Sequence, residues 1–243
     1  MTEARPGVGD ASPRERFLAF VQARRLMLPG ERVLVGVGGG ARSLALMALL
    51  VGAKEELDLG QVAVASVEPV FDEESDAAEV IADVGRLARS YGLDFHAVRP
   101  SPVRGQRVDV VAELTQVARD AGFHRVALGN TLDDDAVRVL CELCRGGAQR
   151  VRGIAPKVKG GVVRPLLVLT DAEAHAFVPG VAAGWGPGVS VGASPEEDRA
   201  RRDVLPRLRA LFPGAALHLQ ELGRLARAGR RRRGTGASGV DGG

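Results

Sequence analysis

Residues 32–50 constrain the fold most, because an apolar strand pattern there runs into three successive glycines and then into an apolar helix pattern. Residues 32–37 (RVLVGV) are apolar at nearly every position, as a strand covered on both faces requires. Gly38, Gly39 and Gly40 follow, and the apolar run over residues 43–54 predicts a buried helix. A buried strand joined to a helix by a glycine turn is typical of α/β domains with a parallel sheet.

Strand and helix patterns continue to alternate along the chain. The alternation predicts βαβ units, and therefore a doubly wound, mainly parallel five-stranded sheet with helices on both faces. Gly92 and Gly122 follow two of the helices and can take the left-handed conformation that ends many helices. The expected strands are residues 32–37, 61–67, 93–99, 125–129 and 162–169, and the expected helices are residues 14–28, 43–54, 74–91, 107–121 and 133–145.

Changes in composition mark the expected domain boundaries. Residues 1–13 form a polar leader that we expect to be flexible, and residues 14–178 form the nucleotide-binding domain. Residues 179–228 are expected to be a Gly- and Pro-rich loop followed by charged helices, which Pro206 interrupts. Residues 229–243 have the low complexity of a disordered basic tail.

Basic charge is concentrated near the C-terminus. Residues 224–233 hold six Arg and no acidic residue, whereas the whole chain of 243 residues has a formal net charge of +3. Clustered Arg side chains neutralise phosphates whatever the base sequence, so this segment predicts contact with RNA. A solvated, disordered end is the alternative. The residues that we expect to contact RNA are Arg230, Arg231, Arg232 and Arg233.

Cysteine content and hydrophobic runs indicate the compartment. Two Cys in a chain of this length argue against a disulfide framework. The first sixteen residues contain no apolar region that could serve as a signal peptide. The longest apolar run, residues 43–53, is too short to span a bilayer. We therefore expect a cytoplasmic protein without a membrane segment.

The glycine turn has the construction of a phosphate site. Glycines let the backbone approach a ligand closely, and the N-terminus of the following helix offers unpaired amides and the positive end of a dipole. Ser43 could add a hydroxyl donor or cap the helix, and the guanidinium of Arg42 could bind a phosphate directly. The candidate nucleotide ligands in this turn are Gly38, Gly39, Gly40, Arg42 and Ser43.

A dinucleotide fingerprint is one interpretation of the turn. Residues 36–41 (GVGGGA) match G-x-G-x-x-A, and Glu68 ends the next expected strand, where an acid would bind a ribose. The spacing is longer than this pattern requires, since Glu68 lies 27 residues after Ala41 and the acid is expected about 20 residues on. A nicotinamide- or flavin-dependent oxidoreductase is therefore an alternative.

A second interpretation explains more of the chain. Residues 32–50 resemble the PP-loop of ATP pyrophosphatases, in which a strand is followed by Ser-Gly-Gly-x-Asp-Ser and an apolar helix. Residues 126–147 resemble the second signature of the tRNA-modifying members, Gly-His-x-x-Asp-Asp-x-x-Glu-Thr. Residues 164–167 (RPLL) and residues 199–214 resemble two later elements of the same proteins, in the same order. The chain is thus similar to 2-thiocytidine synthetases and to the N-terminal domain of tRNA lysidine synthetases.

The resemblance implies an ATP-binding, tRNA-modifying enzyme. In that family the loop amides hold the ATP phosphates, a tRNA base oxygen attacks the α-phosphate, and a sulfur or amine nucleophile then displaces AMP. It further implies a Mg²⁺ ion near the phosphates, with Asp133 and Asp134 matching the paired acids as catalytic and metal-binding residues. A cap at the N-terminus of a helix is the other role open to these acids. Gly129 and Asn130 join the expected nucleotide site.

Several positions depart from the family pattern. Gly38 stands where the family has Ser, and Arg42 stands where it has Asp, which reverses a charge at the phosphate site. Asn130 replaces His, and residues 137–138 (VR) replace Glu-Thr. These substitutions leave open a non-catalytic nucleotide- or RNA-binding scaffold, and a homodimer is also open.

The cysteines argue against an iron–sulfur mechanism. Cys141 and Cys144 have Cys-x-x-Cys spacing, but they continue the apolar stripe of the helix expected at residues 133–145 and do not match the family's cysteine positions. We expect both thiols to be part of the core. The four His are scattered without the spacing of metal ligands: His96, His124, His175 and His218.

Overall fold

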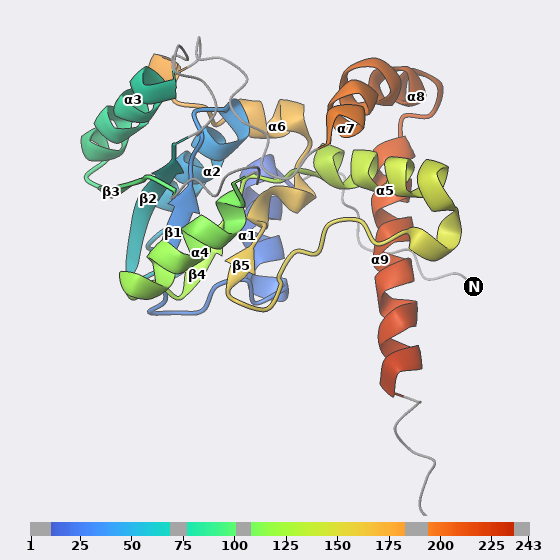
Figure 1. Ribbon diagram of the computed structural model, residues 1–243, viewed down its shortest axis with the longest axis horizontal. Helices are drawn as coiled ribbons and strands as arrows, with labels where there is room; N and C mark the ends of the chain where they lie inside the picture. The colour runs from blue at the N-terminus through green and yellow to red at the C-terminus, as the bar shows by residue number, and fades with distance from the viewer. Residues whose placement is uncertain (1–10, 69–76, 101–107, 183–193, 236–243) are drawn as a thin grey trace, which may run out of the picture. The chain divides into compact units, whose positions relative to one another are not determined.

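The computed structural model describes residues 11–68, 77–100, 108–182 and 194–235 (Figure 1). It divides into two compact units, each described by itself below. The first comprises Met1–Asn130 and Pro156–Val191, and the second comprises Thr131–Ala155 and Gly192–Gly243. The division differs from the expected boundary at residue 178, because the helix expected at residues 133–145 groups with the C-terminal helices.

The first unit contains a fully parallel, five-stranded sheet with the strand order β3-β2-β1-β4-β5. The doubly wound sheet expected from the sequence is therefore confirmed. The chain moves outward from β1 to β3 and then returns to β4 on the other side of β1, so the strand order reverses between β1 and β4. The strands are β1 (Arg32–Gly36), β2 (Gln61–Val67), β3 (Asp94–Val98), β4 (Arg125–Ala127) and β5 (Val162–Val163).

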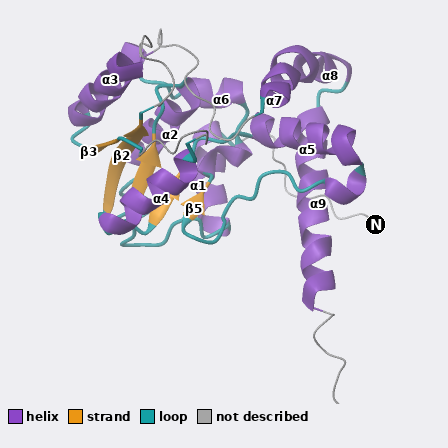
Figure 2. Cartoon of the chain, viewed as in Figure 1, coloured by secondary structure: helices purple, strands orange, loops and turns teal. Residues whose placement is uncertain are grey.

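Helices cover both faces of this sheet (Figure 2). Gly92 and Gly122, which follow α3 and α4, have φ angles of 69° and 72°, as expected for residues that end helices. The helices of the first unit are α1 (Pro13–Ala23), α2 (Ala41–Gly52), α3 (Ala77–Ser90), α4 (Val110–Asp120) and α6 (Asp171–His175), with short 3₁₀ turns η2 (Pro165–Val168) and η3 (Gly180–Ala182).

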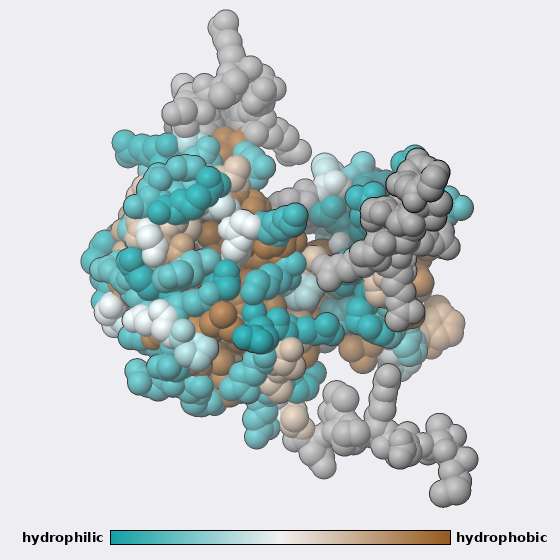
Figure 3. Space-filling model, turned by 90° about the horizontal axis from the view of Figure 1, so that it is seen from below, coloured by the Kyte–Doolittle hydropathy of each residue, from teal (hydrophilic) through white to brown (hydrophobic). Residues whose placement is uncertain are grey.

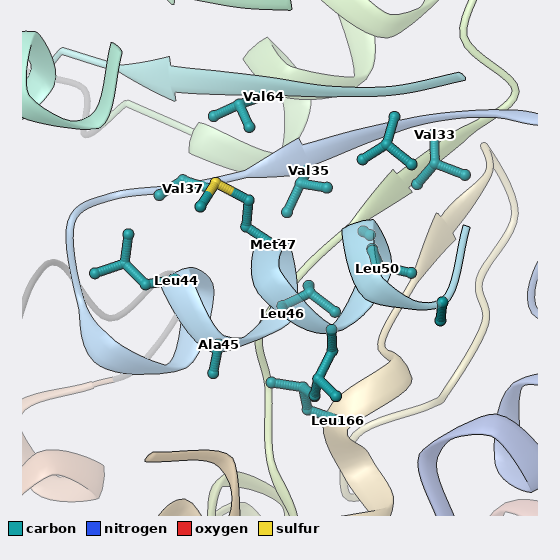
Figure 4. Close-up of a cluster of buried hydrophobic side chains, with 14 of the residues drawn as sticks. Val33, Val35, Val37, Leu44, Ala45, Leu46, Met47, Leu50, Val64 and Leu166 are labelled. Carbon is teal, nitrogen blue, oxygen red and sulfur yellow. The ribbon is translucent and has the colours of Figure 1, made fainter. Parts of the chain in front are cut away.

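Alternate residues of β1 enter two separate cores. Val33 and Val35 pack with Met47 of α2 on one face of the sheet, as Figure 4 shows. Leu34 points to the other face, where it packs with Leu114 of α4. Burying a side chain of this size contributes about 1.5–3 kcal/mol relative to leaving it exposed. The two cores thus fix the position of β1, and with it the start of the glycine turn.

The fifth strand is shorter than the sequence predicts. A strand over residues 162–169 is wrong beyond Val163, because Pro165–Val168 forms a 3₁₀ turn. Pro165 has no amide hydrogen for a sheet ladder and its ring fixes φ, so the strand cannot continue through it. Leu166 and Leu169 are nevertheless fully buried in the same core as α2.

The second unit is helical throughout its described elements. Its core contains Leu132, Ala136, Val137 and Cys141 of one helix together with Leu205 and Ala216. Pro206, expected to interrupt the charged segment, lies in the first turn of a helix, where its missing amide hydrogen costs little. The elements are α5 (Leu132–Gly146), η1 (Ala148–Arg150), α7 (Pro195–Arg199), a π-helical segment η4 (Ala200–Val204), α8 (Leu205–Leu211) and α9 (Ala215–Thr235).

Helix α9 extends further than expected. It continues to Thr235, so the backbone of residues 229–235 is helical where the sequence predicted disorder. Ala and Arg favour helix, and the first half of α9 packs against α5, which allows the helix to propagate into the Arg-rich stretch. The leader at residues 1–10 and the last residues of the tail lie outside the described part of the chain.

Hydrophilic side chains cover much of the face drawn in Figure 3. Within the described segments, no helix combines the length and the apolar character that crossing a membrane requires.

Candidate functional site

The glycine turn leaves the carboxyl end of β1, beside the point where the strand order reverses. In doubly wound sheets, ligands bind in the crevice outside the carboxyl ends of the strands at this switch point. Helix α2 begins at Ala41, two residues earlier than expected, and Gly40 is its N-cap residue without any side-chain cap. The hydroxyl of Ser43 donates a hydrogen bond to the carbonyl of Gly40 at 2.8 Å. The Ser43 side chain therefore stabilises the first turn of α2 through a bond to the backbone of the same turn.

The backbone amides of the turn form no hydrogen bond with the described part of the chain. Within the described segments, Gly38, Gly39 and Gly40 donate to no protein acceptor through their amides, whereas the amide of Val37 still bonds to Ala65 of β2 at 2.9 Å. Three consecutive amides that lack a partner among the described residues, at the N-terminus of a twelve-residue helix, have the arrangement that anion sites use.

Two glycines are required by close contacts. Gly39 has a φ of 80°, a conformation that other residues rarely adopt, and a side chain there would overlap Val80 of α3. At Gly129, which follows β4, a Cβ would lie 2.9 Å from the carbonyl oxygen of Arg42 and 3.0 Å from the amide nitrogen of Ser43. The loop after β4 therefore lies directly against the first turn of α2, and the structure brings these predicted site residues together.

Asn130 is held in place by a residue that the sequence analysis assigned to a motif but not to the site. Its side-chain oxygen accepts a hydrogen bond from Nε of Arg164 at 3.1 Å. Asn130 follows β4 and Arg164 follows β5, so both lie at the carboxyl edge of the sheet. Arg164 thus orients a side chain beside the loop that contacts α2.

Ser66 is a second residue that the sequence analysis missed. It is buried in β2, and its hydroxyl donates to the carbonyl of Val37 at 2.5 Å. This bond fixes the last residue before the glycine turn. A single Ser within an otherwise apolar strand (QVAVASV) was the available signal, because a buried hydroxyl needs a partner.

Glu68, the acid of the dinucleotide alternative, lies after β2. Its carboxylate pairs with Nε of Arg99 at 3.0 Å, and the side chain of Arg99 is 84% exposed. An exposed pair of this kind contributes little to stability. The strand order does not separate the two interpretations of the turn, because dinucleotide-binding domains share it.

Asp133 and Asp134 belong to the second unit, in the first turn of α5. Arg209 of α8 forms a bidentate ion pair with Asp133, with Nη1 to Oδ2 at 3.1 Å, and Arg201 of η4 pairs with Oδ1 of Asp134. The other oxygen of Asp134 accepts the amide of Thr131 at 2.8 Å, which completes a capping box. Both acids are buried.

These contacts do not fit a metal site. A Mg²⁺ ion needs carboxylate oxygens that are free to coordinate it, and it keeps near-ideal octahedral geometry. All four carboxylate oxygens of Asp133 and Asp134 already accept hydrogen bonds, and two guanidinium groups in contact with them oppose a further cation. In the segments that the structure describes, no three His, Cys, Asp or Glu side chains are grouped as a metal site. Metal binding by these acids stays a prediction, against which the contacts argue.

Asp135, the next residue, is a buried carboxylate that the sequence analysis did not single out. Burial raises its pKa to about 6, opposed by a hydrogen bond from the amide of Ile154 and by the charge of Arg227. The amide of Ile154 lies 2.6 Å from Oδ1. Gly153 has a φ of 57°, and a side chain there would overlap this carboxylate. Asp135 therefore ties the loop after η1 to α5.

The expectation for the two thiols is half right. Cys141 is buried, and burial raises the pKa of its thiol. Cys144 is exposed, because the last turn of α5 extends beyond the apolar core of the second unit. The buried face of α5 thus ends at Cys141, one turn before the end of the apolar pattern in the sequence.

Comparison with known proteins decides between the two interpretations of the turn. The PP-loop domain family matches residues 12–205, which is most of the chain. The chain belongs to this family. The match includes the glycine turn, the loop after β4 and the acids of α5, and it favours the PP-loop over the dinucleotide fingerprint.

Three curated relatives of this PP-loop protein are named tRNA(Ile)-lysidine synthase. It is 35% identical over 222 residues to the tRNA(Ile)-lysidine synthase of Deinococcus radiodurans, covering 84% of this chain and 36% of that protein. The enzyme of the same name from Geobacter sulfurreducens is 30% identical, with 84% and 46% covered. That from Thermus thermophilus is 31% identical, with 81% and 39% covered. The chain thus spans less than half the length of these three relatives.

A solved structure shares the fold. The U34-tRNA thiolase NcsA from Methanococcus maripaludis, determined with its [4Fe-4S] cluster, superposes with a TM-score of 0.67 over 88% of this chain and 78% of that chain. Sequence identity is 16%, so this similarity concerns the fold alone.

Proposed function

We propose that this PP-loop protein binds ATP at the glycine turn and takes part in tRNA modification by adenylating a base. One observation carries the proposal: three consecutive amides that have no acceptor in the described part of the chain stand at the N-terminus of α2, at the switch point of the sheet, in a chain of the PP-loop family. Gly38, Gly39 and Gly40 would donate to phosphate oxygens. Gly129 and Asn130 would line the same crevice from the loop after β4.

The reaction we propose has two steps. A carbonyl oxygen of the tRNA base attacks the α-phosphorus of ATP, and pyrophosphate leaves. An amine then attacks the activated carbon of the base and expels AMP, which carries away the former base oxygen. We favour an amine over a sulfur nucleophile, because the curated relatives are lysidine synthases and the structural similarity to a thiolase rests on the fold.

The residues of this chain contribute positioning and electrostatic stabilisation. Amides fixed at a helix N-terminus stabilise phosphate charge without reorganising during the reaction. The hydrogen bond from Ser66 to Val37 and the packing of Gly129 against α2 hold these amides in place. No step is assigned to Asp133 or Asp134, whose oxygens are already engaged.

A pyrophosphate-release assay tests the proposal. The protein is incubated with ATP, lysine and unfractionated bacterial tRNA, and we expect pyrophosphate release that depends on tRNA. A Gly39→Val variant should lose the activity, because its side chain would overlap Val80 and distort the turn. Gly52→Ala is the matched control, since Gly52 ends α2 and a Cβ there meets nothing within 4 Å. Equal release by the wild type and Gly39→Val would refute the assignment of the turn.

A nucleotide-binding module without chemistry is the second candidate. It is favoured by Arg42, which stands at a position where the family pattern has Asp, and by the ion pairs of Asp133 and Asp134. In that case ATP binds, but neither pyrophosphate nor AMP appears with any tRNA preparation. Measuring binding and product release on the same sample separates the two candidates.

RNA is the partner that we propose for the Arg-rich end of the chain, in a cytoplasmic protein. Removing residues 230–243 deletes four Arg. If they contact phosphates, the slope of log K against log salt for tRNA binding should become less steep by about 3 to 4, because each of four phosphate contacts releases roughly 0.7–0.9 ions. An unchanged slope would remove this role. Light scattering on the same samples tests the homodimer.

A further inference from the structure

The second unit carries the positive charge of the chain. Residues 131–155 and 194–235 hold fifteen Arg and nine acidic residues, an excess of six positive charges. Because the whole chain has a formal charge of +3, the rest of it carries an excess of three negative charges. A unit with this balance attracts polyanions. Four of its acids are buried, where they form ion pairs or accept hydrogen bonds: Asp133, Asp134, Asp135 and Glu197.

Within this unit, the loop that follows η1 packs against α9, which runs beside α5 (Figure 1). Nη1 of Arg227 donates a hydrogen bond to the carbonyl of Arg152. Gly223 is buried one turn earlier on the same side of α9, where a Cβ would lie 2.8 Å from Val139 and 3.5 Å from the Cα of Gly153. The two glycines thus let the backbones of the loop and the helix approach closely.

Asp135 of α5 holds this junction together. Its buried carboxylate accepts the amide of Ile154 at 2.6 Å and a hydrogen bond from the side chain of Gln220. The charge of Arg227 lies close enough to act on the same carboxylate. One side chain of α5 is therefore connected both to the loop and to α9, and these contacts fix the backbone at Arg152 relative to α9.

Three exposed arginines border the junction. Arg150 and Arg152 belong to the loop, and Arg230 follows Arg227 by three residues, so it lies on the same side of α9. None of the three exposed side chains forms an ion pair with the described residues. The carboxylate of Glu142 is directed at the backbone of the loop, since its Oε2 accepts the amide of Arg152 at 2.6 Å.

We propose that Arg150, Arg152 and Arg230 form a surface that binds the phosphates of RNA. The inference rests on the RNA partner proposed above and extends the contact from the Arg-rich end to the loop after η1. Guanidinium groups pair with phosphate oxygens whatever the base, so this surface positions RNA and selects no sequence. The packing around Asp135 keeps the loop and the helix at a fixed separation, as contact with several phosphates of one backbone requires. An exposed surface suits such a backbone better than a free nucleotide, which binds in a concave pocket.

Binding of unfractionated bacterial tRNA to the full chain, measured by fluorescence anisotropy over a range of salt concentrations, tests the inference. In Arg150→Ala/Arg152→Ala, the slope of log K against log salt should become less steep by about 1.4 to 1.8, because each of two phosphate contacts releases roughly 0.7–0.9 ions. Adding Arg230→Ala should reduce the slope by a further amount of about 0.7–0.9. Arg150→Lys/Arg152→Lys should keep the wild-type slope, because an ammonium group also neutralises a phosphate.

A charge-matched control is available in the same unit. Arg199→Ala/Arg207→Ala removes two exposed arginines of α7 and α8 and should leave the slope unchanged. Circular dichroism melts of all variants show whether they fold. Equal reductions in the slope by the two double Ala variants would overturn the inference, since net charge alone would then explain them.

A wild-type slope for Arg150→Ala/Arg152→Ala would also overturn the inference, and removal of residues 230–243 would still test the Arg-rich end by itself. A Lys variant with a slope as low as that of the Ala variant would contradict the role of charge. Absence of tRNA binding by the wild type would instead refute the proposed RNA partner.

Discussion

The ion pair between Asp133 and Arg209 allows a stability prediction that distinguishes a structural acid from a metal ligand. The Asp133 side chain is 4% exposed, whereas that of Arg209 is 31% exposed. Replacing Arg209 with Ala leaves a buried carboxylate without its bidentate partner. Replacing Asp133 instead leaves a guanidinium that can turn toward water.

The two losses should therefore differ in size. Removing one partner of a fully buried pair costs about 3–5 kcal/mol, and the partial exposure of Arg209 together with the dipole of α5 reduces this to about 2–3 kcal/mol for Arg209→Ala. For Asp133→Ala we expect a loss of about 1 kcal/mol in the free energy of unfolding. The Arg209 guanidinium that remains is partly exposed, so water can solvate it and its loss of the ion pair costs little. For a chain of this size, 2–3 kcal/mol corresponds to a fall in Tm of about 5–10 °C.

Thermal melts followed by circular dichroism measure both effects. Arg207→Ala is the matched control, since Arg207 is an exposed arginine of the same helix. The double variant should be less destabilised than the sum of the two single variants. Two results would contradict this reasoning: a Tm of Arg209→Ala equal to that of Arg207→Ala, or a lower Tm for Asp133→Ala than for Arg209→Ala. Either result would mean that the ion pair does not anchor α8 to α5, and it would remove the basis of the argument against a metal role for Asp133.

Three further predictions concern single side chains. Gly39→Ala should lower the free energy of unfolding by about 1–2 kcal/mol, because Gly39 has a positive φ. Gly52→Ala should be neutral or slightly stabilising. Chemical denaturation measures both, and equal effects of the two substitutions would contradict the reasoning. The pKa of Asp135 is raised from 3.8 to about 6, so its protonated form favours folding below pH 4, and this contribution is lost as pH rises to 6. The Tm of Asp135→Asn minus that of the wild type should therefore increase from pH 4 to pH 7, and a constant difference would contradict the assignment. Cys144 should react with a thiol reagent at neutral pH well before Cys141, because the Cys141 thiol is buried and its pKa is raised. Peptide mapping measures the two rates, and equal rates would contradict the difference in burial.

The sequence predicted the parts of the fold that depend on periodicity. The apolar strand at residues 32–37 and the strand at residues 61–67 appear with nearly the expected bounds, because both are covered on two faces and their pattern has few alternatives. The strand expected at residues 162–169 fails at Pro165, where one residue type overrides an apolar run. The extent of α9 was missed because its order comes from packing on α5, which no local pattern contains.

The sequence predicted the backbone of the candidate site, but it did not predict the ion pairs and hydrogen bonds between side chains. Three glycines in sequence identify the turn, since few other roles need them. Arg201 and Arg209, however, reach Asp134 and Asp133 across 67 and 76 residues, and no spacing rule connects them. The Ser66 hydroxyl and the Arg164 guanidinium also depend on tertiary contacts.

Amide chemical shifts of ¹⁵N-labelled protein during an ATP titration test the central claim most directly. The claim is that the phosphates of ATP contact the amides of Gly38, Gly39 and Gly40. We expect these three resonances to shift saturably and together, and those of Gly30 and Gly92, in turns away from the carboxyl edge of the sheet, to stay in place. Saturable shifts elsewhere with the three glycines unmoved, or no shifts at millimolar ATP, would contradict the claim.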